Sequence, residues 1–363
     1  MARSRRYWIA KGWGRVDEGR RQVLGWTGLI TVSLALTFGL SVAIAHFVVE
    51  APALVPSEEA SYLARHGRRC LDRVADPDVE PAGAFPQFWV RLGEEDCTPG
   101  SWLAQFREFG QTMEQYRAEG PNRAELDAPI ALGVMGDFRV RGEQGRDLVE
   151  PVREFLGLYF QREALLESPV ALPPAAWNPE RGAAGQYDAE ALLSVLKGSC
   201  ADSRAGCLTV TDEDLYVNTL QYVFGLGHFH RRVGVFSMYR LWEDVHNPET
   251  GTTAAAREPE PLRRALKVAV HEMGHEFTVA HCVHYRHCVM AGTNSLSESD
   301  AGSLMLCPLD HEKLRWNLHF DPRVRFEKLA EFGRRYGLHR EARYWQEMAN
   351  SMPLAPNAAG GAL

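Results

Sequence analysis

The amino-acid sequence predicts a mixed α/β (α+β) fold, preceded by one N-terminal transmembrane helix. Two observations support this prediction. Between residues 129 and 277, short apolar runs of strand length alternate with segments in which apolar residues recur at helical spacing. Before them, residues 23–49 contain no Lys, Arg, Asp or Glu. The first pattern is typical of a mixed layer of strands and helices, and the second is typical of a membrane span.

Composition limits the classes of function. The chain has 363 residues, of which 45% are hydrophobic and 24% charged, so it can form a substantial core. Its net charge is -7, and basic residues are concentrated in residues 1–22. A nucleic-acid partner requires a basic surface along a groove or helix face, so DNA and RNA are not predicted partners.

Residues 1–22 and 23–49 are interpreted as a basic cytoplasmic tail and a transmembrane anchor. A helix of about 20 apolar residues crosses roughly 30 Å of hydrocarbon, and the uncharged run is longer than that. The positive-inside rule keeps the basic tail in the cytoplasm, so the rest of the chain is expected to be extracytoplasmic. Two alternatives remain open: a signal peptide cleaved near Ala45, which would release a secreted protein, and a buried core helix.

A linker rich in Pro and Glu is expected at 50–60, a folded domain at 61–350 and a disordered tail at 351–363. The predicted elements of the domain are a helix at 101–118, a strand at 129–135, a helix at 147–160, a strand at 168–172, a helix at 188–196, strands at 207–211 and 232–238, a helix at 259–277 and helical periodicity at 325–348.

The helix predicted at 259–277 contains candidate metal ligands. His271 and His275 are four residues apart, so their imidazoles project from one face within reach of one tetrahedral zinc ion. Glu272 lies on the adjoining flank, where it can contact a water on the metal without being a ligand. The helix must end after Phe277 to bring His281 to the third position, which leaves the fourth position for water. This spacing predicts a catalytic zinc with Glu272 as the general base.

The stretch HEMGHEFTVAHC resembles the H-E-x-x-H-x-x-G-x-x-H-C signature of the archaemetzincins, a family of metzincin-type zinc metallopeptidases. Other stretches resemble the body of the family's domain, among them SWLAQF, NPERG and RVGVFSMYRL, so that about residues 100–320 are covered. The resemblance implies a metzincin-like zincin fold, with a mixed twisted sheet, an active-site helix and a smaller C-terminal helical subdomain. It also implies that Met290 forms the family's Met-turn, an apolar floor beneath the metal.

The resemblance implies a second, structural zinc as well. Cys282, Cys288 and Cys307 fall close to the family's further cysteines, and Asp310 stands where a fourth cysteine would be. Zinc accepts a carboxylate oxygen, so three cysteines and one aspartate form a chemically sound ligand set. The histidines that could replace Asp310 are His284, His287 and His311. The alternative is that the cysteines are buried or paired thiols without a metal.

Thr278 departs from the family pattern, which has glycine at this position. The glycine allows the helix to end with a positive φ. A β-branched residue in that conformation costs about 1–2 kcal/mol. The turn before His281 is therefore expected to be strained or differently shaped.

Four further cysteines are expected to form disulfides, because an even number in a chain that faces an oxidising space favours pairing. Proximity favours Cys200 with Cys207 and Cys70 with Cys97. Four reduced thiols are the alternative.

These features predict a zinc-dependent metallopeptidase in which a zinc-bound water attacks the peptide bond and Glu272 removes its proton. The expected partners are a peptide or protein substrate and, through residues 23–49, the membrane. Two other functions remain open. One is a catalytically silent, zinc-stabilised binding module, if Thr278 misplaces His281. The other is a small-molecule zinc hydrolase, which would differ only in the shape of its cleft.

Overall fold

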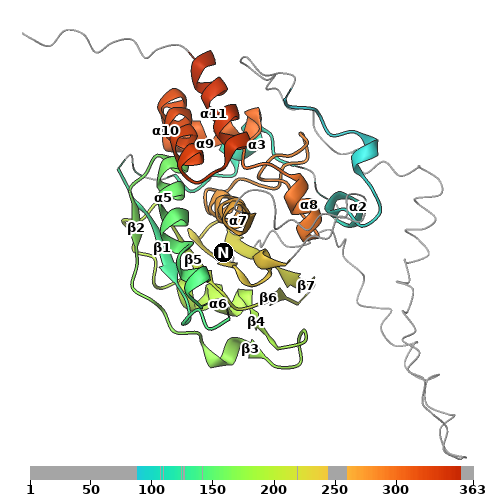
Figure 1. Cartoon of the computed structure of the whole chain (residues 1–363), viewed down its shortest axis with the longest axis vertical. Coiled ribbons are helices and arrows are strands. Elements are labelled where there is room, and N and C mark those ends of the chain that lie inside the picture. The colour runs from blue at the N-terminus through green and yellow to red at the C-terminus, as the bar shows by residue number, and fades with distance from the viewer. Residues whose placement is uncertain are drawn as a thin grey trace, which may run out of the picture. The chain divides into compact units, whose positions relative to one another are not determined.

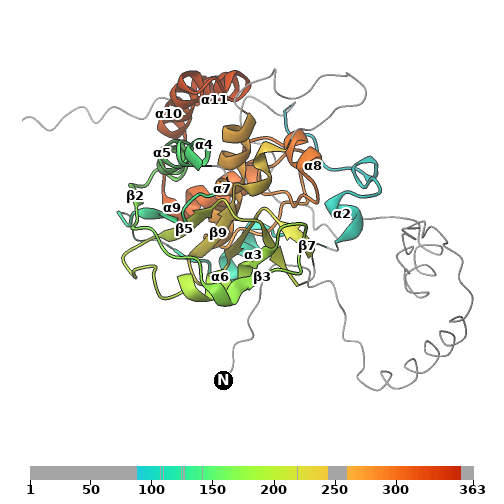
Figure 2. The same cartoon turned by 60° about the horizontal axis from the view of Figure 1, so that its bottom comes forward.

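Two β-sheets with helices packed on them make up the part of the chain that the structure describes (Figures 1 and 2). This computed structural model describes residues 88–352, except 107, 109, 124, 126, 141, 219 and 244–259. The predicted tail, transmembrane segment and linker at 1–60, and the C-terminal residues after 352, lie outside the described residues. Within the described ranges, no helix has both the length and the apolar character that a membrane span needs.

The larger sheet has five strands in the order β2, β1, β5, β9, β8. Their bounds in that order are Ala164–Leu166, Ile130–Val134, Gly206–Thr211, Val233–Ser237 and Gly225–His228. Neighbouring strands are parallel except β8, which pairs antiparallel with β9 and lies at the edge. β1, β5 and β9 are nearly continuous runs of buried residues, as expected of parallel strands covered on both faces. The strands predicted at 129–135, 207–211 and 232–238 are confirmed.

The smaller sheet has four short strands in the order β3, β4, β6, β7. Their bounds are Trp177–Asn178, Gln186–Asp188, Leu215–Val217 and Leu220–Val223. The sequence analysis predicts none of them, because segments this short do not show a clear alternation of apolar and polar side chains. Phe224 alone separates β7 from β8, so the chain passes directly from the smaller sheet to the edge of the larger one.

Helices cover both faces of the larger sheet. α5 (Val149–Phe160) and α7 (Glu260–Glu276) pack on one face and share one cluster of buried apolar side chains. α6 (Ala189–Leu196) packs on the other face over a second cluster (Figure 2). Asp188 caps α6 by accepting hydrogen bonds from the first backbone amides of the helix. The helices predicted at 147–160, 188–196 and 259–277 are confirmed.

The smaller C-terminal helical subdomain is also present. It contains α9 (Pro308–Leu318), α10 (Pro322–Arg335) and α11 (His339–Ser351). α10 and α11 pack together and against α5, where the ring centres of Phe155 and Phe332 are 5.0 Å apart. The helical periodicity at 325–348 therefore belongs to two helices, and Gly337, with φ +74°, lies between them.

Two predicted elements are wrong. The helix predicted at 101–118 is replaced by α2 (Trp102–Gln105) and α3 (Met113–Ala118), because Gly110 takes φ +67° between them and Thr112 starts α3 with a capping box. The strand predicted at 168–172 is reduced to one bridge, between Met135 and Val170. The remaining short helices are η2 (Glu94–Asp96), α4 (Gly142–Arg146), η3 (Pro174–Ala176), η4 (Tyr239–Trp242) and α8 (Leu296–Ala301).

The cysteines fall into two groups. Cys200 and Cys207 form a disulfide, as predicted, which links the chain after α6 to β5. Cys97 is also disulfide-bonded, and Cys70, its predicted partner, lies outside the described residues. The free cysteines of the described part are buried and are those predicted to bind a metal: Cys282, Cys288 and Cys307.

Candidate active site

Three histidines converge at the C-terminal end of α7. His271 and His275 lie one helical turn apart, and their Nε2 atoms are 3.0 Å from each other. His281 follows the helix, and its Nε2 atom lies 3.2 Å from Nε2 of His271. The three histidines thus form one group of potential metal ligands, as the sequence analysis predicts.

The end of α7 brings His281 back toward the helix. The amide of Val279 donates to the carbonyl of Gly274, and the amide of Thr278 donates to the carbonyl of His275. These two hydrogen bonds define a Schellman motif with Thr278 at the position where glycine is usual. Thr278 has φ +69°, so it adopts the left-handed conformation that the family glycine would adopt. The predicted strain is present, but the turn keeps its shape and His281 is not misplaced.

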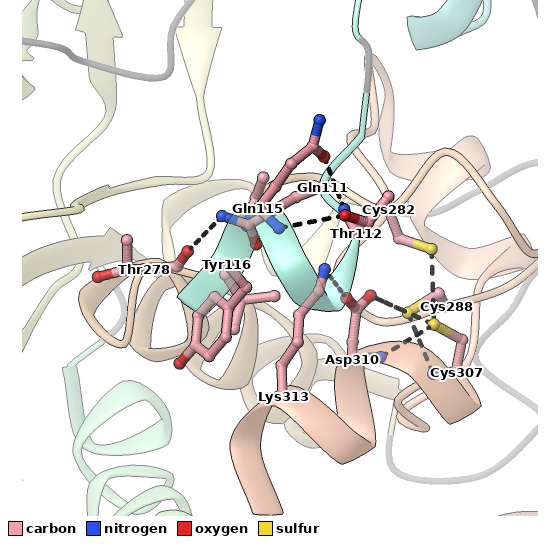
Figure 3. Close-up of polar contacts among 12 residues, drawn as sticks. Gln111, Thr112, Gln115, Tyr116, Thr278, Cys282, Cys288, Cys307, Asp310 and Lys313 are labelled. Carbon is pink, nitrogen blue, oxygen red and sulfur yellow. Dashed lines mark hydrogen bonds and ion pairs between the residues drawn. The ribbon is translucent and has the colours of Figure 1, made fainter. Parts of the chain in front are cut away.

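Hydrogen bonds to other segments hold Thr278 in this conformation. Its hydroxyl donates to the carbonyl of Phe229 at 2.9 Å and accepts from the amide of Asn122 at 3.1 Å. Its carbonyl accepts from Nε2 of Gln111 at 3.1 Å (Figure 3). Tyr116 donates its hydroxyl proton to the carbonyl of Phe277. Three of these contacts come from residues 111–122, so this segment stabilises the turn that precedes His281.

The other ring nitrogen of each histidine faces an oxygen. Nδ1 lies 2.8 Å from the carbonyl of Val289 in His271, 2.8 Å from the carbonyl of Val279 in His275, and 2.6 Å from Oε1 of Glu108 in His281. Because a carbonyl oxygen or carboxylate accepts, each Nδ1 carries a proton and each Nε2 presents a lone pair.

This arrangement fits a zinc ion. Three lone pairs that face one another at 3.0–3.2 Å repel unless a cation lies between them. Tetrahedral Zn–N bonds of about 2.0–2.1 Å place their nitrogens about 3.3 Å apart, close to the observed separations. Burial lowers the pKa of His271 to about 3 and that of His275 well below its usual value, which favours the neutral imidazoles that a metal requires.

Glu272 lies beside the three histidines, against the edge strand. A Cβ on Gly225 would lie 2.6 Å from Oε1 of Glu272, and one on Gly227 would lie 2.4 Å from its carbonyl, so both glycines of β8 allow α7 to approach closely. Burial raises the pKa of the Glu272 carboxyl to about 8, and a backbone hydrogen bond from Gly227 opposes the rise. A carboxyl group with such a pKa exchanges protons readily near neutral pH.

A cleft of about 1040 Å³ opens over the histidines and Glu272. One wall is the chain from Leu220 to Gly227, which includes β7 and the start of β8. The cleft is also lined by Trp102, Phe106 and residues of the segment from Ala291 to Gly302. The cleft therefore has room for several residues of a substrate beside a sheet edge.

Met290 packs against Gly274 of α7, and its role as the Met-turn stays a prediction. It is fully buried, and a Cβ on Gly274 would lie 2.5 Å from its sulfur, so glycine is required for this contact with α7. Its carbonyl accepts from the amide of Cys282, which ties the Met290 turn to the chain just after His281.

A second group of potential ligands lies directly after His281. Cys282, Cys288 and Cys307 converge with Asp310, and all four are buried (Figure 3). The sulfurs of Cys282 and Cys307 are 3.7 Å apart, and tetrahedral Zn–S bonds of about 2.3 Å place sulfurs about 3.8 Å apart. Oδ2 of Asp310 lies 3.3 Å from the sulfurs of Cys288 and Cys307. Among the described residues, Asp310 completes the group, whereas His284, His287 and His311 do not belong to it.

The Asp310 carboxylate is also held from its other side. Nζ of Lys313, one turn further along α9, donates to Oδ1 at 2.8 Å, and both side chains are almost inaccessible to solvent (Figure 3). Burial raises the pKa of Asp310, and the Lys313 ammonium group opposes this rise. Oδ1 is thus occupied by Lys313, and Oδ2 faces the sulfurs.

The site contains one residue that the sequence analysis does not find. Glu108 lies 173 positions before His281 and contacts it through a side-chain hydrogen bond. No local motif surrounds Glu108, so nothing in the sequence alone indicates this contact. The remaining predicted site residues lie where the motif places them.

The fold and the site together define a zincin-type hydrolase, with two ligand histidines and a carboxylate on one helix and a third histidine after a turn. Residues 178–315 match Peptidase family M54. Archaemetzincin from Pyrococcus horikoshii is 31% identical over 194 residues, which cover 51% of this chain and 97% of the relative. Human archaemetzincin-2 is 25% identical over 265 residues, which cover 65% of this chain and 72% of the relative. A crystal structure of archaemetzincin from Methanopyrus kandleri is 31% identical, with a TM-score of 0.43, and covers 53% of this chain and 96% of that one.

The chain therefore belongs to the archaemetzincin family, and it is a zinc metallopeptidase.

Proposed function

We propose that the chain hydrolyses peptide bonds at the three-histidine site, with His271, His275 and His281 as zinc ligands and Glu272 as general base and then general acid. The observation that supports this most directly is the convergence of three Nε2 lone pairs beside a buried carboxyl group. Zinc held at this site would supply a Lewis acid that polarises the substrate carbonyl and lowers the pKa of a water to about 7.

Glu272 transfers the proton from the attacking water to the leaving group. Its carboxylate accepts a proton from the attacking water and then donates it to the nitrogen of the leaving amine. Close packing against β8 holds the carboxylate at the floor of the cleft, where bulk water competes little for its hydrogen bonds.

The substrate is proposed to bind as an extended peptide along β8. This strand is at the edge of the larger sheet, with β9 on one side, and its first residues line the cleft. An extended peptide can add to such an edge through main-chain hydrogen bonds, which are independent of side-chain identity. The reacting carbonyl would then lie over the histidines and Glu272.

Substitution of Glu272 tests the proposed role. Glu272→Gln should bind zinc as the natural chain does, because position 272 contributes no ligand, and should lower kcat by about 10²–10⁴-fold. Glu327→Gln, an exposed position on α10, is the matched control and should change neither quantity. Peptide turnover by Glu272→Gln at the rate of the natural chain would rule out this base.

We also propose that the cysteine group binds a second zinc with a structural role. The separation of the Cys282 and Cys307 sulfurs, which is near that of a tetrahedral site, and the burial of all four side chains support this. Metal analysis should give two zinc ions in the natural chain, and one in either His275→Ala or Cys288→Ser. Two unchanged zinc ions in Cys288→Ser would contradict the second site. If the natural chain holds only one zinc ion and His275→Ala retains it, a silent, zinc-stabilised module is supported instead.

Membrane attachment through residues 23–49, with the peptidase domain extracytoplasmic, is proposed from the uncharged run and its basic flank. Membrane fractionation in sodium carbonate, followed by N-terminal sequencing, tests it. Recovery of the intact chain in the membrane pellet is expected. A soluble chain beginning near residue 46 would show cleavage of a signal peptide instead.

A further inference from the structure

Glu108 contacts the third histidine from outside the catalytic motif. Its Oε1 lies 2.6 Å from Nδ1 of His281, and the two side chains are only 8% and 7% exposed. Glu108 lies between α2 and α3, before the region that matches the peptidase family. This short hydrogen bond therefore joins the metal-binding motif to the first part of the domain.

His281 depends more on such a contact than the other two histidines do. His271 and His275 are residues of α7, so the helix fixes the direction of both side chains. His281 lies after the helix in chain without regular secondary structure. The Nδ1 atoms of His271 and His275 bond to backbone carbonyls. Nδ1 of His281 bonds to a carboxylate, which is the stronger acceptor.

The segment around Glu108 is built to hold this position. Gly110 has φ +67°, and a Cβ there would lie 2.6 Å from the Val283 side chain, so the loop follows the chain just beyond His281 closely. Gln111 bonds to the carbonyl of Thr278 and to the amide of Ala280, on the preceding side. Contacts on both sides of His281 thus place the Glu108 carboxylate at its ring.

Trp102 restricts the ring further. Its indole meets the His281 ring edge-on, with centroids 5.2 Å apart and an interplanar angle of 89°. The His281 ring therefore has the Glu108 carboxylate at Nδ1 and the Trp102 indole against it, which leaves Nε2 directed at the other two histidines.

We propose that Glu108 is a positioning residue for His281: by accepting the Nδ1 proton it fixes the tautomer and orientation that present Nε2 to the metal. Glu108 then belongs to the metal site, although it precedes residues 178–315, which match Peptidase family M54. This inference rests on the proposed zinc site. A carboxylate that bonds to a ligand histidine raises its basicity, and loss of such a partner weakens metal binding by about 10–100-fold.

The test is the zinc affinity of the histidine site, measured on the full chain by competition with chelators of graded affinity. Glu108→Ala should weaken this site by about 10–100-fold. Glu108→Gln should weaken it by about fivefold, because the amide oxygen still accepts the Nδ1 proton but carries no charge. Glu114→Gln is the matched control, since Glu114 lies on the same segment, in the first turn of α3, and its side chain is exposed. It should bind zinc as the natural chain does.

The experiment separates this inference from the proposed zinc site. His275→Ala identifies the histidine-site zinc in the natural chain; if that variant keeps the natural affinity, the proposed site itself is wrong. If His275→Ala loses the histidine-site zinc but the zinc affinity of Glu108→Ala is within twofold of that of the natural chain, the positioning role is overturned. Circular dichroism of the metal-free variants shows whether they are folded. Should Glu108→Ala be unfolded, Glu108→Gln decides the question, and natural affinity in that variant overturns the proposal.

Discussion

Replacing Thr278 by glycine restores the residue that the family signature has, yet the structure predicts that it destabilises this chain. The gain is relief of left-handed strain at φ +69°, about 1–2 kcal/mol for a β-branched residue. The losses are two hydrogen bonds of the hydroxyl group, at about 1 kcal/mol each, and a buried methyl group, at about 0.8 kcal/mol. Glycine also adds about 0.5–1 kcal/mol of chain entropy to the unfolded state. The net expectation is a loss of about 2 kcal/mol in the free energy of unfolding.

Two further substitutions at this position separate strain from hydrogen bonding. Thr278→Val keeps the shape and the strain but removes the hydroxyl, which leaves the partly buried amide of Asn122 without its acceptor, so a loss of about 3 kcal/mol is expected. Thr278→Ser keeps both hydrogen bonds and removes the branch at Cβ, so its stability should be within about 1 kcal/mol of the natural chain.

The assay is equilibrium unfolding in urea with zinc present, and the free energy of unfolding in water is obtained by linear extrapolation. The expected order of stability is the natural chain and Thr278→Ser first, then Thr278→Gly, then Thr278→Val. A Thr278→Gly chain more stable than the natural one would refute the reasoning, because strain would then exceed the hydrogen bonds that hold the turn.

Three other predictions concern stability elsewhere. Asp310→Asn should cost about 3–5 kcal/mol and one zinc ion, because the buried Lys313 ammonium loses its charged partner; full stability and metal content would contradict this. Burial lowers the pKa of Lys267 to about 7, so the unfolded chain binds more protons between pH 7 and its ordinary pKa, and stability should rise by about 2 kcal/mol from pH 7 to pH 9. Urea unfolding of Lys267→Met should lack this rise, and equal pH dependence in both chains would show that Lys267 is not its source. Cys200→Ser should lower the free energy of unfolding by about 2 kcal/mol, since its disulfide closes a short loop, and an unchanged value in non-reducing urea would argue against the bond.

The catalytic motif is predictable from sequence because its geometry is local. His271, Glu272 and His275 occupy one helix, so their spacing determines which face they share. His281 and the cysteine group follow within a short span, and Asp310 is found because it occupies a position where the family has a ligand. The main parallel strands are equally predictable, since strands buried on both faces are apolar runs.

Features that depend on distant partners are not predictable in this way. β8 contains two glycines in four residues and has little strand propensity, but it forms because β9 offers hydrogen bonds and α7 packs closely against it. The predicted helix at 101–118 fails because the loop between α2 and α3 packs along the chain beyond His281. Glu108 has its role only through that loop, and 173 intervening positions conceal the contact.

Glu108, Gln111 and Asn122 support the end of α7 from outside the metal-binding motif. This support determines the shortest fragment that can be active. It also determines which segments must be exchanged together when chimeras are made between relatives. A chain shortened to begin at β1 would keep the three ligand histidines and Glu272, yet it would lose Glu108, Gln111 and Asn122, which contact His281 and Thr278. A transplanted motif with glycine at position 278 would not need all of these groups, whereas this motif moved into a relative would need them supplied. Chimeras made within the domain should therefore keep activity only when Thr278 and its supporting residues Glu108, Gln111 and Asn122 come from the same parent sequence.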